Sequence, residues 1–204
     1  MGFYENRLLP HIVNVAMNTK AITDERRRCL ENVTGTVLEI GFGTGLNLPH
    51  YPRSVTKVVA VDPSETSARL ARGRIAASPF PVEIIGLSAE TLPVADASFE
   101  SIVSTFTLCT ILDVAGALLE MRRALRPGGR LYFVEHGRAA DPKVERWQKR
   151  LNRIQRTVFG GCQLDRPISA LIEQAGFEME RLENGYLKGA PKFGGFLYRG
   201  VAKG

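Results

Sequence analysis

Short β-branched runs alternate with helix-like segments along most of this chain, and this alternation restricts the fold more than any other feature. Helices between consecutive strands are the crossover connections of a parallel sheet. Several of the runs are apolar on both faces, which is typical of strands that helices cover on each side. The predicted strands are Thr36–Ile40, Lys57–Val61, Val82–Ile85, Ser101–Thr105 and Arg130–Glu135.

Helix signals and the end of the chain support the same architecture. The segment Ser64–Ala77 follows a proline, and Asp113–Leu125 ends at a Pro-Gly-Gly turn that cannot continue a helix. Two β-like runs, Phe177–Tyr186 and Phe193–Ala202, predict an antiparallel hairpin that closes the sheet. We therefore expect an α/β fold with a doubly wound, seven-stranded sheet that is mostly parallel.

The length of 204 residues predicts a single domain over residues 1–204, with a helical cap at 1–34 and the core at 35–204. The apolar runs are shorter than the ~20 residues that a membrane span needs, and the N-terminus has no signal-peptide pattern. We expect a cytoplasmic protein. The net charge of +6 is a modest basic bias that does not by itself indicate a nucleic acid partner.

The three cysteines, Cys29, Cys109 and Cys162, are odd in number and far apart, and no His stands at ligand spacing from any of them. This pattern matches neither a disulfide framework nor a zinc motif. Reduced thiols are expected, and no metal site. Cys109 and Cys162 are predicted to be small buried hydrophobic residues, with a place in an acceptor pocket or reaction with each other as the alternatives.

A glycine-rich loop follows the first predicted strand and precedes the helix candidate Leu46–Tyr51. Gly41, Gly43 and Gly45 allow a sharp turn and the close approach of a ligand. A dinucleotide fingerprint needs its third glycine at position 46, where this chain has Leu46. The spacing therefore favours a ligand with a small carboxylate, such as S-adenosylmethionine, over a pyrophosphate.

An acidic residue, Asp62, ends the second predicted strand. At that point of a doubly wound sheet a carboxylate can accept hydrogen bonds from both ribose hydroxyls. The alternative is structural: the glycine loop is then only a tight connection, and Asp62 caps the helix that follows Pro63.

In combination these motifs resemble the class I S-adenosylmethionine-dependent methyltransferases, from the Glu39–Gly45 loop to Leu125-Arg126-Pro127-Gly128-Gly129. The resemblance implies a Rossmann-like core that binds S-adenosylmethionine. It also implies cofactor contacts at Glu39, Gly41, Phe42, Gly43, Gly45, Asp62, Pro63, Ser88, Ala89, Glu90 and Thr105.

Less common pieces resemble the alkyl thiol S-methyltransferases, among them Thr107-Leu108-Cys109, Glu135-His136 and Gly160–Arg166. Some bacterial relatives methylate phospholipid amines. The resemblance implies a small, lipophilic acceptor, with a thiol as first choice and phosphatidylethanolamine or another amine as the alternative. A nucleotide-binding oxidoreductase or a non-catalytic binding module is a more distant alternative. The sequence predicts neither the pathway nor the oligomeric state.

His136 directly follows the fifth predicted strand, at the sheet edge where ligands of α/β proteins bind. It is the best placed general base, because its pKa suits the task. Hydrogen bonding to a loop carbonyl is the alternative role.

The segment that starts at Asp141-Pro142 predicts an amphipathic helix. Its apolar stripe comprises Trp147, Leu151, Ile154 and Val158, and its basic face comprises Lys143, Arg146, Lys149, Arg150, Arg153 and Arg156. One interpretation is a crossover helix with a solvated basic face. The other is a lid, formed with the N-terminal segment Phe3–Met17, that touches an anionic membrane surface. The basic residues lack interleaved aromatic residues for base stacking, so no nucleic acid partner is expected.

Overall fold

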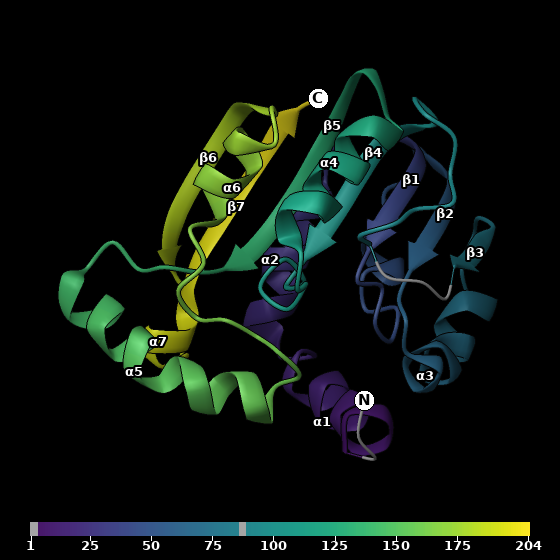
Figure 1. Cartoon of the computed structure of the whole chain (residues 1–204). Coiled ribbons are helices and arrows are strands. Elements are labelled where there is room, and N and C mark those ends of the chain that lie inside the picture. The colour runs from purple at the N-terminus through teal and green to yellow at the C-terminus, as the bar shows by residue number, and fades with distance from the viewer. Residues whose placement is uncertain (1–3, 86–88) are drawn as a thin grey trace.

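A seven-stranded sheet forms the centre of the computed structural model, which describes residues 4–85 and 89–204. Its strand order is β3-β2-β1-β4-β5-β7-β6 (Figure 1). The strands are β1 Gly35–Ile40, β2 Val55–Val61, β3 Val82–Ile85, β4 Phe99–Thr105, β5 Leu125–His136, β6 Glu178–Tyr186 and β7 Phe196–Lys203. Strands β1 to β5 pair in parallel, and β7 runs antiparallel to both β5 and β6. The expected α/β fold is confirmed.

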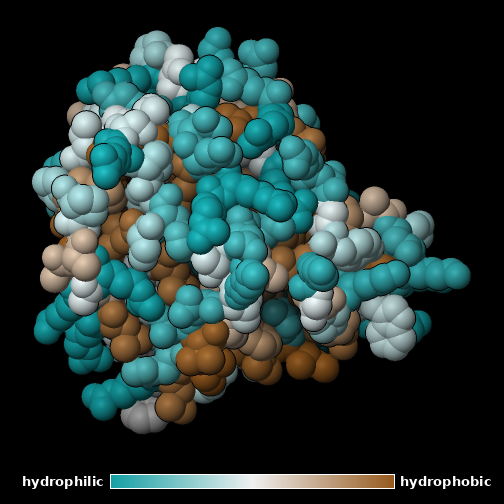
Figure 2. Space-filling model, turned by 180° about the vertical axis from the view of Figure 1, so that it is seen from behind, coloured by the Kyte–Doolittle hydropathy of each residue, from teal (hydrophilic) through white to brown (hydrophobic). Residues whose placement is uncertain are grey.

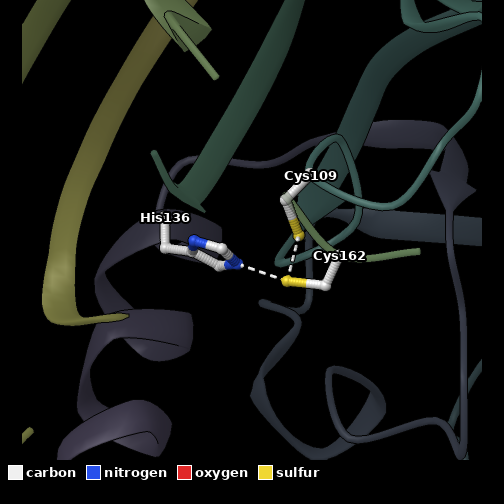
Figure 3. A group of neighbouring side chains, drawn as sticks. All are labelled: Cys109, His136 and Cys162. Carbon is white, nitrogen blue, oxygen red and sulfur yellow. Dashed lines mark hydrogen bonds between the residues drawn. The ribbon is translucent and has the colours of Figure 1, made fainter. Parts of the chain in front are cut away.

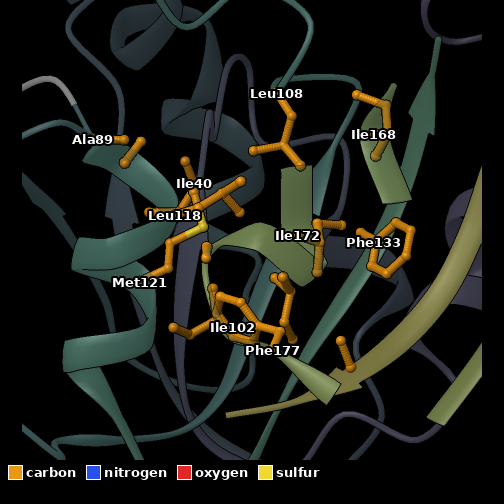
Figure 4. Packing of buried hydrophobic residues seen from close by; sticks show 14 of the residues in the cluster. Ile40, Ala89, Ile102, Leu108, Leu118, Met121, Phe133, Ile168, Ile172 and Phe177 are labelled. Carbon is orange, nitrogen blue, oxygen red and sulfur yellow. The ribbon is translucent and has the colours of Figure 1, made fainter. Parts of the chain in front are cut away.

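Helices cover both faces of the sheet. On one face, α4 (Val114–Ala124) and α6 (Ile168–Gln174) pack on a cluster that includes Ile102 and Phe133 (Figure 4). On the other face, α2 (Lys20–Leu30) and α3 (Glu65–Ala76) cover a second buried cluster. Neighbouring residues of a strand alternate between these two cores. Burial contributes on the order of 1.5–3 kcal/mol for each large apolar side chain in them.

Side-chain caps set where two of the predicted helices begin. The Ser64 hydroxyl accepts a hydrogen bond from the Ser67 N–H at the start of α3. The Asp113 carboxylate accepts one from the Gly116 N–H at the start of α4. Both side chains satisfy N–H groups that have no partner within the helix. The helices Glu65–Ala76 and Val114–Ala124 therefore lie within one residue of their predicted bounds.

The helix expected at Leu46–Tyr51 is wrong. The structure has only a short 3₁₀ turn there, η2 (Leu48–His50). Pro49 has no N–H to donate, and Pro52 stops any continuation soon after. Consequently, no α-helix N-terminus faces a ligand directly after the glycine loop.

The C-terminal hairpin is confirmed, with α7 (Lys192–Gly195) in the connection between β6 and β7. Three further elements lie at the lower end of the molecule in Figure 1, toward which β1, β2 and β4 point. They are η1 (Tyr4–Leu8), α1 (Leu9–Ala16) and α5 (Pro142–Val158). Within the described ranges, no helix combines the length and the apolar character that a bilayer crossing requires.

Candidate functional site

The glycine loop forms a tight turn at the carboxyl end of β1. Gly41, Gly43 and Gly45 all have positive φ, at 71°, 56° and 76°. A Cβ at Gly41 would lie 2.0 Å from the Thr107 side chain, so only glycine fits there. A Cβ at Gly43 would meet nothing closer than 3.9 Å, so the space beside this residue is open. Phe42 points the other way and is buried in the second core cluster.

Asp62, at the end of β2, is directly opposite this turn. Its two carboxylate oxygens accept hydrogen bonds from the N–H groups of Gly43 and Ser64, each at 2.8 Å. Partial burial raises the pKa of Asp62, and these two hydrogen bonds oppose the rise. Helix α3 is capped by Ser64, so the capping role considered for Asp62 is not the one it has. Asp62 instead joins the glycine turn to the start of α3.

A cleft of about 410 Å³ begins at Pro63, the residue after Asp62. Its wall includes Pro63 and the first residues of α3, and Arg7 of the N-terminal segment closes one side. Clefts of this volume are of the size that binds small molecules. Pro63 is thus placed next to both Asp62 and a ligand-sized space.

Beneath the turn lies a network of buried polar side chains. The carboxylate of Glu39, which is 1% exposed, accepts hydrogen bonds from Asn47 Nδ2 at 2.9 Å and from the Tyr51 hydroxyl at 2.7 Å. Asn47 Nδ2 also donates to Thr105 Oγ1 at 3.0 Å. Burial raises the pKa of Glu39 to about 7, against the effect of these hydrogen bonds. Glu39 and Thr105 therefore support the turn from below.

Arg26, which no sequence motif singles out, enters this network from α2. Its Nη1 donates to Asn47 Oδ1 at 2.9 Å and to Thr105 Oγ1 at 2.5 Å, and its guanidinium lies 5.4 Å from the centroid of the Phe106 ring. Its Nε is buried without a hydrogen-bond partner in the described structure. Burial lowers the pKa of Arg26. A buried guanidinium with an unused N–H is suited to receive an anionic group.

Phe106 marks the end of β4 with a backbone conformation that is rare for its residue type. Its φ is +56°, in the left-handed region. Such strain persists where the surroundings enforce it, often at functional sites. Here the buried Glu135 accepts hydrogen bonds from Ser104 Oγ at 2.8 Å and from the Thr107 N–H at 2.9 Å, which holds the loop in place.

The remaining cofactor residues expected from the resemblance lie between β3 and α4. Ala89 is buried in the first core cluster, and the Glu90 carboxylate accepts a hydrogen bond from the Asp113 N–H at 3.0 Å. Ser88 lies outside the described residues.

His136 is half-buried at the carboxyl end of β5 and lies beside two cysteines (Figure 3). Its Nε2 is 2.9 Å from Cys162 Sγ, and Cys109 Sγ is 3.7 Å from Cys162 Sγ. Both cysteines are buried, as predicted. The hydrogen bond between Cys162 and Cys109, together with His136, lowers the pKa of Cys162. Burial works against protonation of His136, but its contact with Cys162 outweighs this and raises the pKa of His136.

The N-terminal elements bridge the two sides of this region. The Tyr4 hydroxyl donates to the Val158 carbonyl at 2.8 Å, at the end of α5. Tyr4 belongs to η1, and in the next element, α1, Asn14 Oδ1 accepts a hydrogen bond of 2.7 Å from the Thr44 hydroxyl in the glycine turn. Together, η1 and α1 therefore connect the glycine turn to α5.

The predicted apolar stripe of α5 is mostly exposed: Trp147 by 56%, Ile154 by 62% and Val158 by 41%. The helix is attached through Val144 and Gln148 instead. The Gln148 amide accepts a hydrogen bond from the Ala139 N–H and donates one to the Gly137 carbonyl, both at 2.9 Å. Hydrophobic side chains gather along the lower edge of the molecule in Figure 2, the end where α1 and α5 lie. The apolar stripe is therefore not what attaches this helix to the molecule.

Comparisons with known proteins agree with this geometry. A methyltransferase domain model matches residues 38–133. The chain is 31% identical to human thiol S-methyltransferase TMT1A over 73% of its own length and 62% of that protein. It is also 31% identical to a phosphatidylethanolamine N-methyltransferase of Cereibacter sphaeroides, over 68% of its own length and 70% of that protein. The chain thus spans about three fifths of the thiol S-methyltransferase.

Solved structures show the same fold. An S-adenosylmethionine-dependent methyltransferase from Mesorhizobium loti superposes with a TM-score of 0.67, covering 92% of this chain and 100% of that one at 18% identity. With the strand order, the glycine turn and the relatives in agreement, the chain belongs to the S-adenosylmethionine-dependent methyltransferases, with S-adenosylmethionine as its cofactor.

Proposed function

We propose that this protein transfers a methyl group from S-adenosylmethionine to a small, lipophilic acceptor, and that the acceptor is a thiol. The observation that supports methyl transfer best is the convergence of three groups at the carboxyl ends of β1, β2 and β4. These are the open glycine turn, the Asp62 carboxylate and the buried Arg26 guanidinium. Ligands of open α/β sheets bind at this edge.

The residues present suit the chemical groups of S-adenosylmethionine. The unused Nε–H of Arg26 suits the carboxylate of the methionine part, and the open space at Gly43 allows close approach. Asp62 and Pro63 suit the ribose, since a carboxylate at this position accepts hydroxyl donors. Ser88, Ala89 and Glu90 are proposed to border the adenine.

Other residues of the site keep these groups in position. Glu39 and Thr105 hold Asn47, and with it Arg26, through the buried network. Phe42 acts through packing beneath the turn, because its side chain is in the core. Gly41 and Gly45 supply the backbone shape.

The sulfonium of the cofactor supplies an electrophilic methyl group. The protein's part is to align an acceptor with it and to exclude water. Holding reacting atoms at about 3–3.5 Å can supply on the order of 7–11 kcal/mol of barrier reduction. The elements η1 and α1, which together connect the glycine turn to α5, are placed to cover such a site.

A thiol acceptor is supported by the similarity to the thiol S-methyltransferases and by the position of His136. A thiol with a pKa of about 8.5 is only partly ionised at neutral pH. His136 lies at the carboxyl end of β5. We propose that it favours the thiolate form of the acceptor.

A second candidate is the N-methylation of phosphatidylethanolamine. The exposed apolar residues of α1 and α5 favour it, because they form a surface that a lipid bilayer could cover. The similarity to the Cereibacter sphaeroides enzyme supports it too. With either acceptor, we propose that α1 and α5 contact an anionic membrane surface peripherally.

A methyl-transfer assay with labelled S-adenosylmethionine would test the proposal across alkyl thiols, phenols, amines and phosphatidylethanolamine vesicles. We expect labelled thioether, and at least a tenfold lower rate for Asp62→Asn. Asp24→Asn is the matched control, because Asp24 is a surface residue paired with Arg27. Label in phosphatidylethanolamine alone would select the second candidate. Transfer to no acceptor, or equal rates for both variants, would contradict the proposal.

A further inference from the structure

Cys109, His136 and Cys162 come from three separate segments, and the side-chain atoms with which they could hold a metal ion converge. Cys109 is in the loop after β4, His136 ends β5, and Cys162 is in the loop after α5. Their two sulfur atoms and one imidazole nitrogen all lie within 4.8 Å of one another (Figure 3). We infer that these three residues form a binding site for a zinc ion with one coordination position left for an acceptor thiol.

The chemistry of the three ligands matches zinc. Two thiolates and one imidazole are a known ligand set of catalytic zinc sites, in which a fourth position takes water or substrate. Soft sulfur ligands exclude magnesium and calcium, which prefer oxygen. Two thiolates also neutralise the double positive charge, which allows the ion to be buried.

The distances are close to those of a tetrahedral site. With Zn–S bonds of about 2.3 Å, two thiolate sulfurs lie about 3.8 Å apart. Cys109 Sγ and Cys162 Sγ are 3.7 Å apart. Zinc-bound nitrogen and sulfur lie about 3.5 Å apart, whereas His136 Nε2 and Cys162 Sγ are 2.9 Å apart. The third distance, between the His136 nitrogen and Cys109 Sγ, is at most 4.8 Å, so the imidazole ring has to move away from Cys162 and toward Cys109 to complete the geometry.

The surrounding hydrogen bonds hold the two cysteine loops together. The Gln163 N–H donates to the Cys109 carbonyl at 2.9 Å, which joins one loop directly to the other and limits how far apart the two sulfur atoms can move. The Arg166 guanidinium donates to the carbonyls of Leu108 and Ile111, on either side of Cys109. The ligand positions are therefore built into the fold.

A glycine pair sets the direction of Cys162. Gly160 and Gly161 both have positive φ, at 56° and 88°, and they make the turn that follows α5. Glycine adopts this conformation without strain, which other residues rarely do. The turn directs Cys162 inward, toward Cys109 and His136.

The role of the ion rests on the proposed thiol acceptor. On coordination, the acceptor thiol releases its proton to solvent and becomes a zinc-bound thiolate. Its sulfur lone pair forms the new bond to the methyl carbon, while the bond from that carbon to the sulfonium sulfur breaks and leaves its electron pair on that sulfur. The products are a neutral thioether, S-adenosylhomocysteine and the released proton. In this arrangement His136 favours the thiolate as a metal ligand.

The test is a metal measurement on the full chain. The protein is purified without chelator, dialysed against zinc-free buffer, and its zinc is measured per chain by elemental analysis. We expect about one zinc in the wild type and at least a tenfold loss in Cys109→Ser, Cys162→Ser and His136→Asn. Cys29→Ser is the matched control, because Cys29 is a free cysteine outside the trio, and it should keep its zinc.

Cobalt gives a second readout that does not depend on catalysis. Titration of the metal-free protein with Co²⁺ should give thiolate-to-cobalt charge-transfer absorption in the wild type and in Cys29→Ser but not in Cys162→Ser. Circular dichroism establishes that each variant is folded. No zinc, no cobalt spectrum, or equal binding by all variants would overturn the site.

The two proposals fail in different ways. Zinc bound by the trio with no thiol methylation would contradict the proposed function and leave the metal site standing. Thiol methylation by a protein that binds no zinc, with full activity in the presence of a chelator, would contradict the metal site and leave the proposed function standing.

Discussion

Arg26 is the residue whose environment most directly implies a charged ligand. It is buried, its Nε has no partner in the described structure, and its Nη1 is held by Asn47 and Thr105. Removing one member of a buried charged pair typically costs about 2–5 kcal/mol.

We therefore expect Arg26→Gln to weaken the binding of S-adenosylhomocysteine at least thirtyfold in isothermal titration calorimetry. Arg27→Gln is the matched control, because Arg27 is the next residue of α2 but is exposed and paired with Asp24. Similar affinities for the two variants would show that Arg26 does not hold the cofactor.

Glu39 predicts a dependence of stability on pH. Its pKa is raised from 4.5 to about 7 by burial, so the folded protein binds more protons than the unfolded chain between these values. Stability then falls as the pH rises through this range, by about 1.4 kcal/mol for each unit of pKa difference.

Urea unfolding at pH 5, 6, 7 and 8 measures this effect. The free energy of unfolding of the wild type should fall by about 2–3 kcal/mol relative to Glu39→Gln. The amide is similar in shape, and the Tyr51 hydroxyl can turn to accept from it. Parallel curves for the two proteins would contradict the assigned ionisation of Glu39.

At the scale of elements, α5 has two exposed faces of different character. Trp147 and Ile154 are exposed on one, and the basic residues Arg146, Lys149, Arg150 and Arg153 are exposed on the other. A helix of this kind binds in the interface of an anionic bilayer, where each basic residue contributes about 1 kcal/mol.

Co-sedimentation with vesicles tests this surface. We expect the wild type to bind phosphatidylglycerol-containing vesicles at least tenfold more tightly than phosphatidylcholine vesicles. Replacing Arg146, Lys149, Arg150 and Arg153 by Gln should abolish the difference. The control replaces four exposed basic residues elsewhere, Arg28, Arg53, Arg72 and Lys188. An equal effect of both sets, or no dependence on anionic lipid, would contradict the role of α5.

Across the whole molecule, the features that could be predicted from the sequence depend on neighbouring residues. The strands follow from local hydrophobic patterns, and the glycine turn from residues that are two positions apart. The helix prediction at Leu46–Tyr51 is wrong because Pro49 and Pro52 interrupt the backbone hydrogen bonds that such a helix needs.

The parts of the site that escaped prediction depend on contacts between distant segments. Arg26 stands in a run of three arginines, which resembles a solvated surface, and only the packing of α2 on the sheet buries it. His136 and Cys162 are 26 residues apart, and Cys109 and Cys162 are 53 apart, so no rule on ligand spacing detects them. The apolar stripe of α5 stays exposed because Gln148, a polar residue, forms the attachment instead.

The most direct test of the proposed cofactor site is a crystal structure of the protein with S-adenosylhomocysteine. We predict that the ligand lies along the Gly41–Gly45 turn, with its carboxylate on Arg26 and its ribose hydroxyls on Asp62. A ligand bound elsewhere, or an empty crevice with the Arg26 and Asp62 contacts unchanged at saturating ligand, would contradict it.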